Sequence, residues 1–149
     1  MQITRLGTHI KVRDFEASKA FYLGLGFVPV FAYGPEEEVK EVYRGMVFEH
    51  GGGKLEIADG HRAVKGKVFE RRMADSKVSL MINVESLVPL MARLRKQGIE
   101  PAVGPRHYYW GTLEVVVKDP DGVVLVFIAS YSAAEARELQ ADERFGRVD

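Results

Sequence analysis

The sequence predicts an α+β fold built from two tandem modules, each a strand, a helix and three further strands. The first observation behind this prediction is an internal duplication, in which residues 10–29 and 82–101 align without gaps at an offset of 72. The second is the hydrophobic spacing, which changes within each copy from a period of two to a helical period. The third is the glycine that ends each predicted helix, at Gly26 and Gly98. A repeat of this kind determines the whole architecture, so it is read before local propensities.

The first module begins with a strand over residues 8–13, in which Ile10 and Val12 point to one face. Asp14 is expected to cap the next helix, because its carboxylate can accept hydrogen bonds from the amides of the first turn. Three strands are predicted after this helix, over residues 27–33, 41–49 and 54–58. The last two are joined by Gly51-Gly52-Gly53, which is typical of a hairpin turn.

The second module repeats this order after a basic, aperiodic linker over residues 60–77 that has room for a short helix. Ser86 is expected to cap the second helix. Its strands are predicted over residues 78–84, 100–103, 112–118 and 123–130. With module one at about 3–59 and module two at 78–131, we expect one domain over residues 1–149, closed by a helix over residues 132–141.

The composition excludes several classes of function. The absence of cysteine rules out disulfides, thiolate zinc sites and a cysteine nucleophile. No apolar run approaches the roughly 18 residues of a membrane span. Twenty-one basic residues balance twenty-one acidic ones, so no net field draws the molecule toward nucleic acid or an anionic membrane. We therefore expect a cytoplasmic protein with neither nucleic acid nor membrane as a partner.

Several segments together resemble the vicinal oxygen chelate superfamily, which includes glyoxalases, bleomycin resistance proteins and dioxygenases. The segments are Val12-Arg13-Asp14-Phe15-Glu16-Ala17-Ser18-Lys19-Ala20-Phe21-Tyr22, Leu25-Gly26-Phe27, Trp110-Gly111 and Asp119-Pro120-Asp121-Gly122. The resemblance covers about residues 3–131. It implies that the strands curl into a cupped mixed sheet with the helices outside, and that the protein forms a homodimer, as many members do.

Metal-dependent members of that superfamily place His, Gln or Glu on the cup-facing side of equivalent strands. Carried onto this sequence, the four donor positions fall on Gly7, Glu56, Ser79 and Val126. Only Glu56 is a usual metal donor, and one carboxylate cannot hold a catalytic ion that also keeps open coordination positions. The resemblance therefore implies the metal-free bleomycin resistance branch, with no metal, no cofactor and no catalytic residue. In that branch a drug is captured stoichiometrically, and we expect a planar aromatic or glycopeptide-like ligand.

The residues expected to line the ligand site come from both modules. Three adjacent aromatic residues, 108–110, cannot all face the core, because successive side chains alternate along a strand, so at least one should face the ligand or a dimer partner. The expected lining residues are His9, Glu56, Ser79, Met81, Tyr109, Trp110, Val124 and Val126.

Other interpretations of these residues remain open. His9 lies two positions after the first donor position, so a bulge or an irregular strand start would bring it over a metal. Glu56 is either a general base whose pKa is raised by burial, or a carboxylate that anchors a cation or bonds to a neighbouring side chain. His50 and His61 are expected in exposed turns. The alternative function is a metal-dependent lyase or isomerase, thiol transferase or dioxygenase that uses His9 and Glu56, and a third is an accessory domain.

Overall fold

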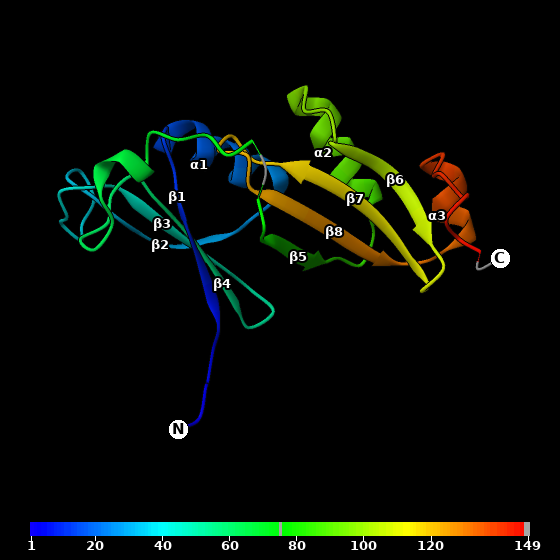
Figure 1. Cartoon of the computed structure of the whole chain (residues 1–149), viewed down its shortest axis with the longest axis horizontal. Coiled ribbons are helices and arrows are strands. Elements are labelled where there is room, and N and C mark those ends of the chain that lie inside the picture. The colour runs from blue at the N-terminus through cyan, green and yellow to red at the C-terminus, as the bar shows by residue number, and fades with distance from the viewer. Residues whose placement is uncertain (75, 148–149) are drawn as a thin grey trace. The chain divides into compact units, whose positions relative to one another are not determined.

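The chain divides into two compact units, Met1–Met73 and Ala74–Asp149, in a computed structural model that describes residues 1–74 and 76–147. Each unit contains a four-stranded mixed sheet with a helix on one face (Figure 1). This confirms the predicted α+β class and the tandem order of strand, helix and three strands. Position 75 of the expected linker lies outside the described residues. None of the helices in the described part of the chain has the length and apolar character that crossing a bilayer requires.

The first unit follows the predicted order of elements. They are β1 (Gly7–Lys11), α1 (Phe15–Leu25), β2 (Pro29–Tyr33), β3 (Gly45–His50), β4 (Gly53–Ala58) and the short 3-10 helix η1 (Gly66–Val68). The strands lie in the order β1-β4-β3-β2. β1 runs parallel to β4, and the other two pairings are antiparallel. The parallel pair is possible because α1 provides the crossover between β1 and the rest of the sheet.

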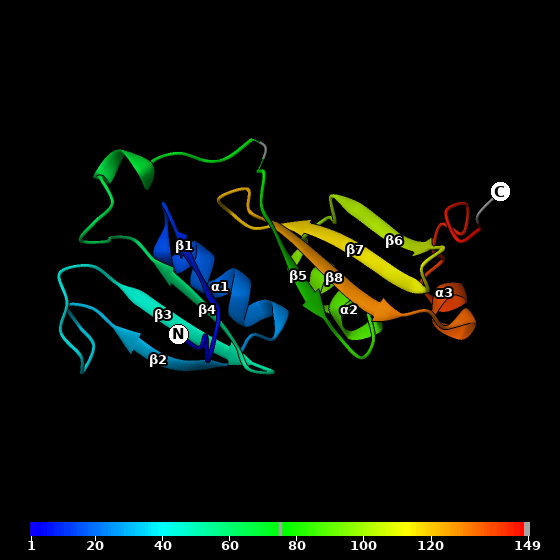
Figure 2. The ribbon, with the colours of Figure 1, turned by 60° about the horizontal axis from the view of Figure 1, so that its bottom comes forward.

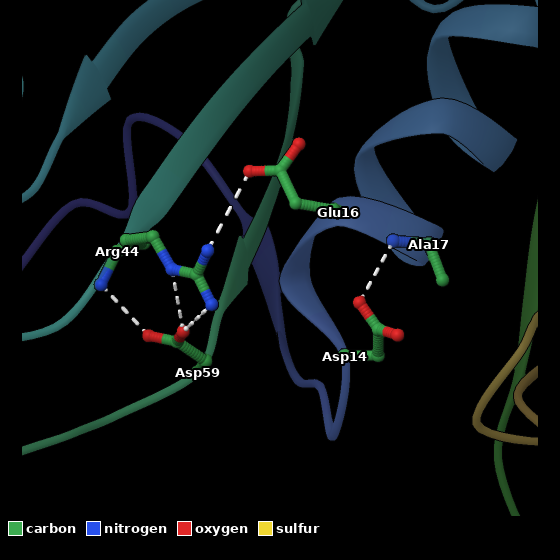
Figure 3. A network of polar contacts seen from close by, with 5 residues as sticks. All are labelled: Asp14, Glu16, Ala17, Arg44 and Asp59. Atoms are coloured by element: carbon green, nitrogen blue, oxygen red, sulfur yellow. Dashed lines mark hydrogen bonds and ion pairs between the residues drawn. The ribbon is translucent and has the colours of Figure 1, made fainter.

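The ends of α1 are determined by the residues that the sequence indicated. Asp14 accepts a hydrogen bond from the Ala17 amide at 3.0 Å, as Figure 3 shows. Gly26 ends the helix with a φ of 96°, a conformation that costs a residue with a Cβ atom more than it costs glycine. Between these ends α1 buries Tyr22, whose ring lies 5.9 Å from that of Phe48 on β3. The helix therefore covers one face of the first sheet.

Arg44, just before β3, connects the end of β4 to the start of α1 (Figure 3). Its backbone amide donates to Asp59 Oδ1 at 2.7 Å, and its Nε donates to Oδ2 at 2.8 Å. A longer ion pair of 3.5 Å joins the guanidinium to Glu16. The guanidinium carbon also lies 5.1 Å from the centre of the Phe15 ring. Three segments of the first unit are thus tied together around Arg44.

The second unit repeats the topology of the first. Its elements are β5 (Ser79–Asn83), α2 (Val88–Gln97), β6 (Val103–Tyr108), β7 (Thr112–Lys118), β8 (Val124–Ser130) and α3 (Ala133–Glu138). The strand order is β5-β8-β7-β6, and β5 runs parallel to β8 (Figure 2). His9 pairs with Glu56 in the first sheet, and Met81 pairs with Val126 in the second. The duplication read from the sequence is therefore also a duplication of strand register.

Side-chain caps determine how the elements of the second unit are joined. Asp119 Oδ1 accepts from the amides of Asp121 at 2.9 Å and Val123 at 2.8 Å, which closes the predicted turn between β7 and β8. Ser86 accepts from the Val88 amide at 3.2 Å. Ser86 in turn donates to Glu135 of α3 at 3.0 Å, and the Leu87 amide donates to the same carboxylate. The start of α2 is thus capped partly by a residue 49 positions further along the chain.

Three predicted boundaries are wrong. β3 begins at Gly45 rather than at residue 41, because the Arg44 amide is taken by Asp59. β6 covers Val103–Tyr108 rather than residues 100–103, since an irregularity between Val103 and Arg106 lets the strand continue along β7. The C-terminal helix is Ala133–Glu138 rather than residues 132–141. It stops because Gln140 adopts a φ of 52°, and the chain then turns back so that Asp142 pairs with Arg106 on β6.

Candidate functional site

Each sheet has one face that carries its long helix, α1 or α2, and an opposite face that this helix does not cover. We call these opposite faces the first and second uncovered faces. They follow from the registers, because residues in register across neighbouring strands share a face. The first uncovered face carries His9, Phe31, Tyr33, Val47, Lys54 and Glu56. The second carries Ser79, Met81, Arg106, Glu114, Val116, Val124 and Val126.

Glu56 is the centre of a polar cluster on the first uncovered face. The Tyr33 hydroxyl donates to Glu56 Oε1 at 2.8 Å, and Lys54 Nζ lies 3.2 Å from Oε2. Tyr33 can reach across because its ring lies over Gly45, where an added Cβ would come within 2.1 Å of the ring. Position 45 therefore requires glycine so that the phenol can reach the carboxylate.

The contacts of Glu56 determine its charge. Burial by itself would raise the pKa of this carboxyl, but the hydrogen bond from Tyr33 and the ammonium of Lys54 outweigh burial and lower the pKa. The same burial and the same bond raise the pKa of the Tyr33 hydroxyl. The general-base interpretation, which required a raised pKa, is therefore wrong in direction. The other interpretation, a carboxylate bonded to a neighbouring side chain, describes what is seen.

His9 lies directly opposite Glu56, on β1. Its ring centre is 5.2 Å from that of His61, and its Nε2 atom is buried without a hydrogen-bond partner. Burial lowers the pKa of His9 against the opposing effect of the Glu56 carboxylate. The expectation that His61 is simply an exposed turn residue is wrong, because it packs on His9. His50 is the last residue of β3, and its Nε2 accepts a hydrogen bond from the Val28 amide at 3.0 Å.

The residues at the family's metal-donor positions do not fit a metal ion. Gly7 and Val126 carry no donor atom on their side chains. Ser79, on β5 in register with Val124, offers only a neutral hydroxyl, which is not one of the usual zinc ligands. In residues 1–74 and 76–147, no group of three His, Asp or Glu side chains gathers in a way that could hold an ion. A catalytic ion needs about three protein donors, and His9 with Glu56 supplies two.

The part of the second uncovered face that β5 and β8 form is mainly apolar. Met81, Val126 and Val116 form one row across β5, β8 and β7, and Ser79 and Val124 form the next. Met81 leaves 72% of its surface exposed. Four of the expected lining residues, Ser79, Met81, Val124 and Val126, therefore lie together on one face of one sheet.

Tyr108 and Trp110 form a stacked pair, the aromatic platform, where β6 turns into β7. Their ring centres lie 4.5 Å apart and their planes differ by 5°. The Trp110 indole donates to Glu114 Oε1 at 2.9 Å, and the Thr112 hydroxyl donates to the same oxygen at 2.7 Å. Tyr109 meets Trp110 edge-on at 4.9 Å. Over half of the Trp110 surface remains exposed, at 54%.

The expected lining residues include Tyr109 and Trp110 but not Tyr108 or Tyr33. Tyr108 was placed before a strand, whereas it ends β6 and pairs with Thr112. The alternation of β7 indicates that Thr112 and Glu114 face away from the buried Leu113. Because Tyr108 pairs with Thr112, it lies on the same face as these two residues. No signal in the sequence shows that Tyr33 bends over Gly45, since that contact depends on the register between β2 and β3.

A separate pocket lies beside β6, lined by His107, Tyr131, Glu143, Arg144, Gly146 and Arg147. His107 pairs with the buried Leu113, so its side chain points away from the second uncovered face. Its ring stacks on Tyr131 at 3.7 Å, and its Nδ1 lies 3.0 Å from Glu143. These contacts hold the C-terminal segment against β6. None of the expected lining residues belongs to this pocket.

The chain belongs to the glyoxalase/bleomycin resistance protein/dioxygenase superfamily, whose family model matches residues 3–127. Among curated proteins, none matches this sequence.

Solved structures share the fold. A bleomycin-binding protein complexed with bleomycin is 25% identical, with a TM-score of 0.56, over 88% of this chain and 99% of that one. A bleomycin resistance determinant encoded on the transposon Tn5 is 24% identical, with a TM-score of 0.58, over 86% of this chain and 98% of that one. The fosfomycin resistance protein FosX from Mesorhizobium loti is 17% identical, with a TM-score of 0.59, over 92% and 97%.

Proposed function

We propose that this protein binds a planar aromatic or glycopeptide-like drug without a metal ion and sequesters it without chemical change. The observation that carries the proposal is an exposed aromatic platform in a superfamily fold whose metal-donor positions hold Gly7, Ser79 and Val126. The similar structure of a bleomycin-binding protein with its drug supports this choice of ligand class.

The second uncovered face provides contacts for such a ligand. The second face offers apolar side chains and the ring of Trp110, where stacking contributes about 0.5–1.5 kcal/mol beyond the burial of surface. Sites of this kind combine an apolar lining with a few polar groups that determine orientation.

Titration with bleomycin and with neutral planar aromatic compounds tests the proposal. Trp110 is the only tryptophan in the sequence, so its fluorescence reports directly on the platform. We expect the fluorescence to change saturably with one ligand per site, and calorimetry to show a similar affinity. Trp110→Leu should weaken binding about 3- to 10-fold, as the loss of one stacking contact requires. Tyr109→Leu, which removes only an edge contact, should weaken it less. Absence of both heat and a fluorescence change with every compound would overturn the proposal.

A second candidate function is a metal-dependent lyase, isomerase, transferase or dioxygenase with unusual ligands. It is favoured by one observation, the direct pairing of His9 with Glu56 on neighbouring parallel strands. Metal analysis of protein purified without chelator separates the two candidates. Stoichiometric metal that His9→Ala removes would support the enzyme, whereas ligand binding that is unchanged in EDTA would support capture.

A further inference from the structure

Arg106 on β6 has an unusual position on the second uncovered face. It pairs in register with Glu114 of β7, yet no ion pair or hydrogen bond joins its side chain to any residue in the described part of the chain. Its Nε atom is buried without a partner. The guanidinium carbon lies 4.4 Å from the centre of the Phe145 ring. Arg106 is thus a half-buried cation with no ion pair of its own in the described part of the chain, and the Asp142 carboxylate acts on it only through a longer-range electrostatic interaction.

The acidic residues nearest to Arg106 are already engaged. Glu114 directs Oε1 toward the indole of Trp110 and the hydroxyl of Thr112. Asp142, which pairs with the Arg106 backbone, is held by Arg144 through contacts of 2.7 to 3.2 Å. A partly desolvated charge without an ion pair is costly, and the cation–π contact with Phe145 offsets only part of that cost. An anion that reached the guanidinium would remove most of the remainder.

The C-terminal segment holds Arg106 beside the aromatic platform. The His107 amide donates to the Asp142 carbonyl at 3.0 Å, and the Asp142 amide donates to the Pro105 carbonyl at 2.9 Å. These bonds bring Phe145 under the guanidinium and within 6.1 Å of the Tyr108 ring centre. Phe145 lies beyond residues 3–127, which match the family model. The arrangement is therefore made by a segment that the family pattern does not include.

We propose that Arg106 is an anion-binding group, and that the natural ligand is a planar aromatic molecule bearing a carboxylate, sulfonate or phosphate. This inference rests on the proposed function, because it assumes that the ring stacks on the aromatic platform. A guanidinium presents a planar fork of N–H donors that matches a carboxylate or phosphate in two parallel hydrogen bonds. In the described part of the chain, no hydrogen bond or ion pair engages its NH1 and NH2 groups.

Two probes that differ only in charge test the inference, 2-naphthoate and 2-naphthamide. We expect the full-length protein to bind naphthoate at least tenfold more tightly than naphthamide, by calorimetry and by Trp110 fluorescence. Arg106→Gln should remove this preference while leaving the naphthamide affinity unchanged. Arg106→Lys should retain part of it, because an ammonium keeps the charge and loses the fork. The control is Arg137→Gln, which removes an equal charge from an exposed position on α3 and should change neither affinity.

The outcomes separate this inference from the proposed function. If both naphthyl compounds bind equally and Arg106→Gln changes neither, capture by the platform stands and the role of Arg106 is overturned. If Arg137→Gln lowers the naphthoate preference as much as Arg106→Gln, the effect is one of overall charge, and the role of Arg106 is again overturned. If bleomycin and both naphthyl compounds fail to bind, the proposed function is overturned, and the inference with it. Unchanged fluorescence spectra and unfolding midpoints establish that the variants are folded.

Discussion

Glu56 illustrates how a residue on a sheet surface acquires its chemistry from its neighbours. The Glu56 carboxylate accepts a hydrogen bond from Tyr33 and lies 3.2 Å from the ammonium of Lys54. These two contacts keep it ionised at neutral pH, although burial opposes ionisation. An ionised carboxylate is suited to anchoring a ligand and is poorly suited to taking up a proton near pH 7. The ionised state of Glu56 therefore favours a role in binding over a role in acid–base catalysis.

Replacing Tyr33 by phenylalanine should raise the pKa of Glu56, because the variant loses the hydroxyl that stabilises the ionised form. The pKa is measured from the side-chain carboxyl carbon by NMR titration. Tyr109→Phe, on the second unit, is the control and should leave the pKa of Glu56 unchanged. An unchanged pKa in Tyr33→Phe would show that Lys54 alone keeps the carboxyl ionised.

The same substitution should make stability depend differently on pH. Because the pKa of Glu56 is lowered in the folded protein, its contribution to stability is present above the unfolded value of 4.5. That contribution disappears as the pH falls through the folded value. We therefore expect Tyr33→Phe to lower the free energy of unfolding by about 1 kcal/mol at pH 7. The difference from the parent protein should shrink below about pH 4.5.

At the scale of elements, capping and ion-pair contacts join segments that are distant in the sequence. Glu135 of α3 caps the start of α2, and Asp59 after β4 binds the backbone and side chain of Arg44 before β3. Contacts of this kind involve a backbone amide that would otherwise be left without an acceptor. They are therefore worth more than ion pairs between exposed side chains.

Two substitutions around Arg44 compare these kinds of contact. Asp59→Ala removes the acceptor of a backbone amide and a charge-assisted bond, so we expect a loss of about 1–3 kcal/mol in the free energy of unfolding. Glu16→Ala removes only the exposed 3.5 Å ion pair to the same guanidinium and should cost less than about 1 kcal/mol. Urea unfolding measures both. Equal losses would mean that the ion pairs, and not the amide, hold this junction.

At the scale of the whole molecule, the edge of the first sheet suggests a dimer, which we propose on the basis of β2. This strand is the last in its sheet, and Val30 on it is 55% exposed and Phe31 46% exposed. An apolar edge strand offers unpaired backbone groups to another chain. A second copy of the protein would remove both the apolar surface and the free edge from water.

Sedimentation equilibrium should therefore give a mass about twice that of the 16.7 kDa chain. Val30→Lys should shift the protein toward the monomer, because a buried ammonium opposes pairing at this edge. Val42→Lys adds the same charge at a valine that is 87% exposed and outside any strand, and it should leave the mass unchanged. A parent protein that sediments as a monomer at all concentrations would contradict the proposal.

Much of the architecture was determined by the sequence itself. The offset of 72 residues predicted the two modules, and Asp14, Gly26 and Gly98 marked helix ends that the structure confirms. These features are readable because a cap or a left-handed glycine acts on backbone groups within a few residues of itself. The hairpin at Gly51 and Gly52 is local in the same sense.

The partners of the site residues were decided only by the tertiary structure. That Tyr33 bonds to Glu56, that Trp110 stacks on Tyr108, and that Phe145 underlies Arg106 depend on strand register and on the return of the chain end to β6. The choice between the two interpretations of Glu56 was left open for the same reason, since Tyr33 and Lys54, which lower its pKa, lie on two strands. A periodic pattern shows which face a side chain takes, but the choice of neighbours follows from how the strands are aligned.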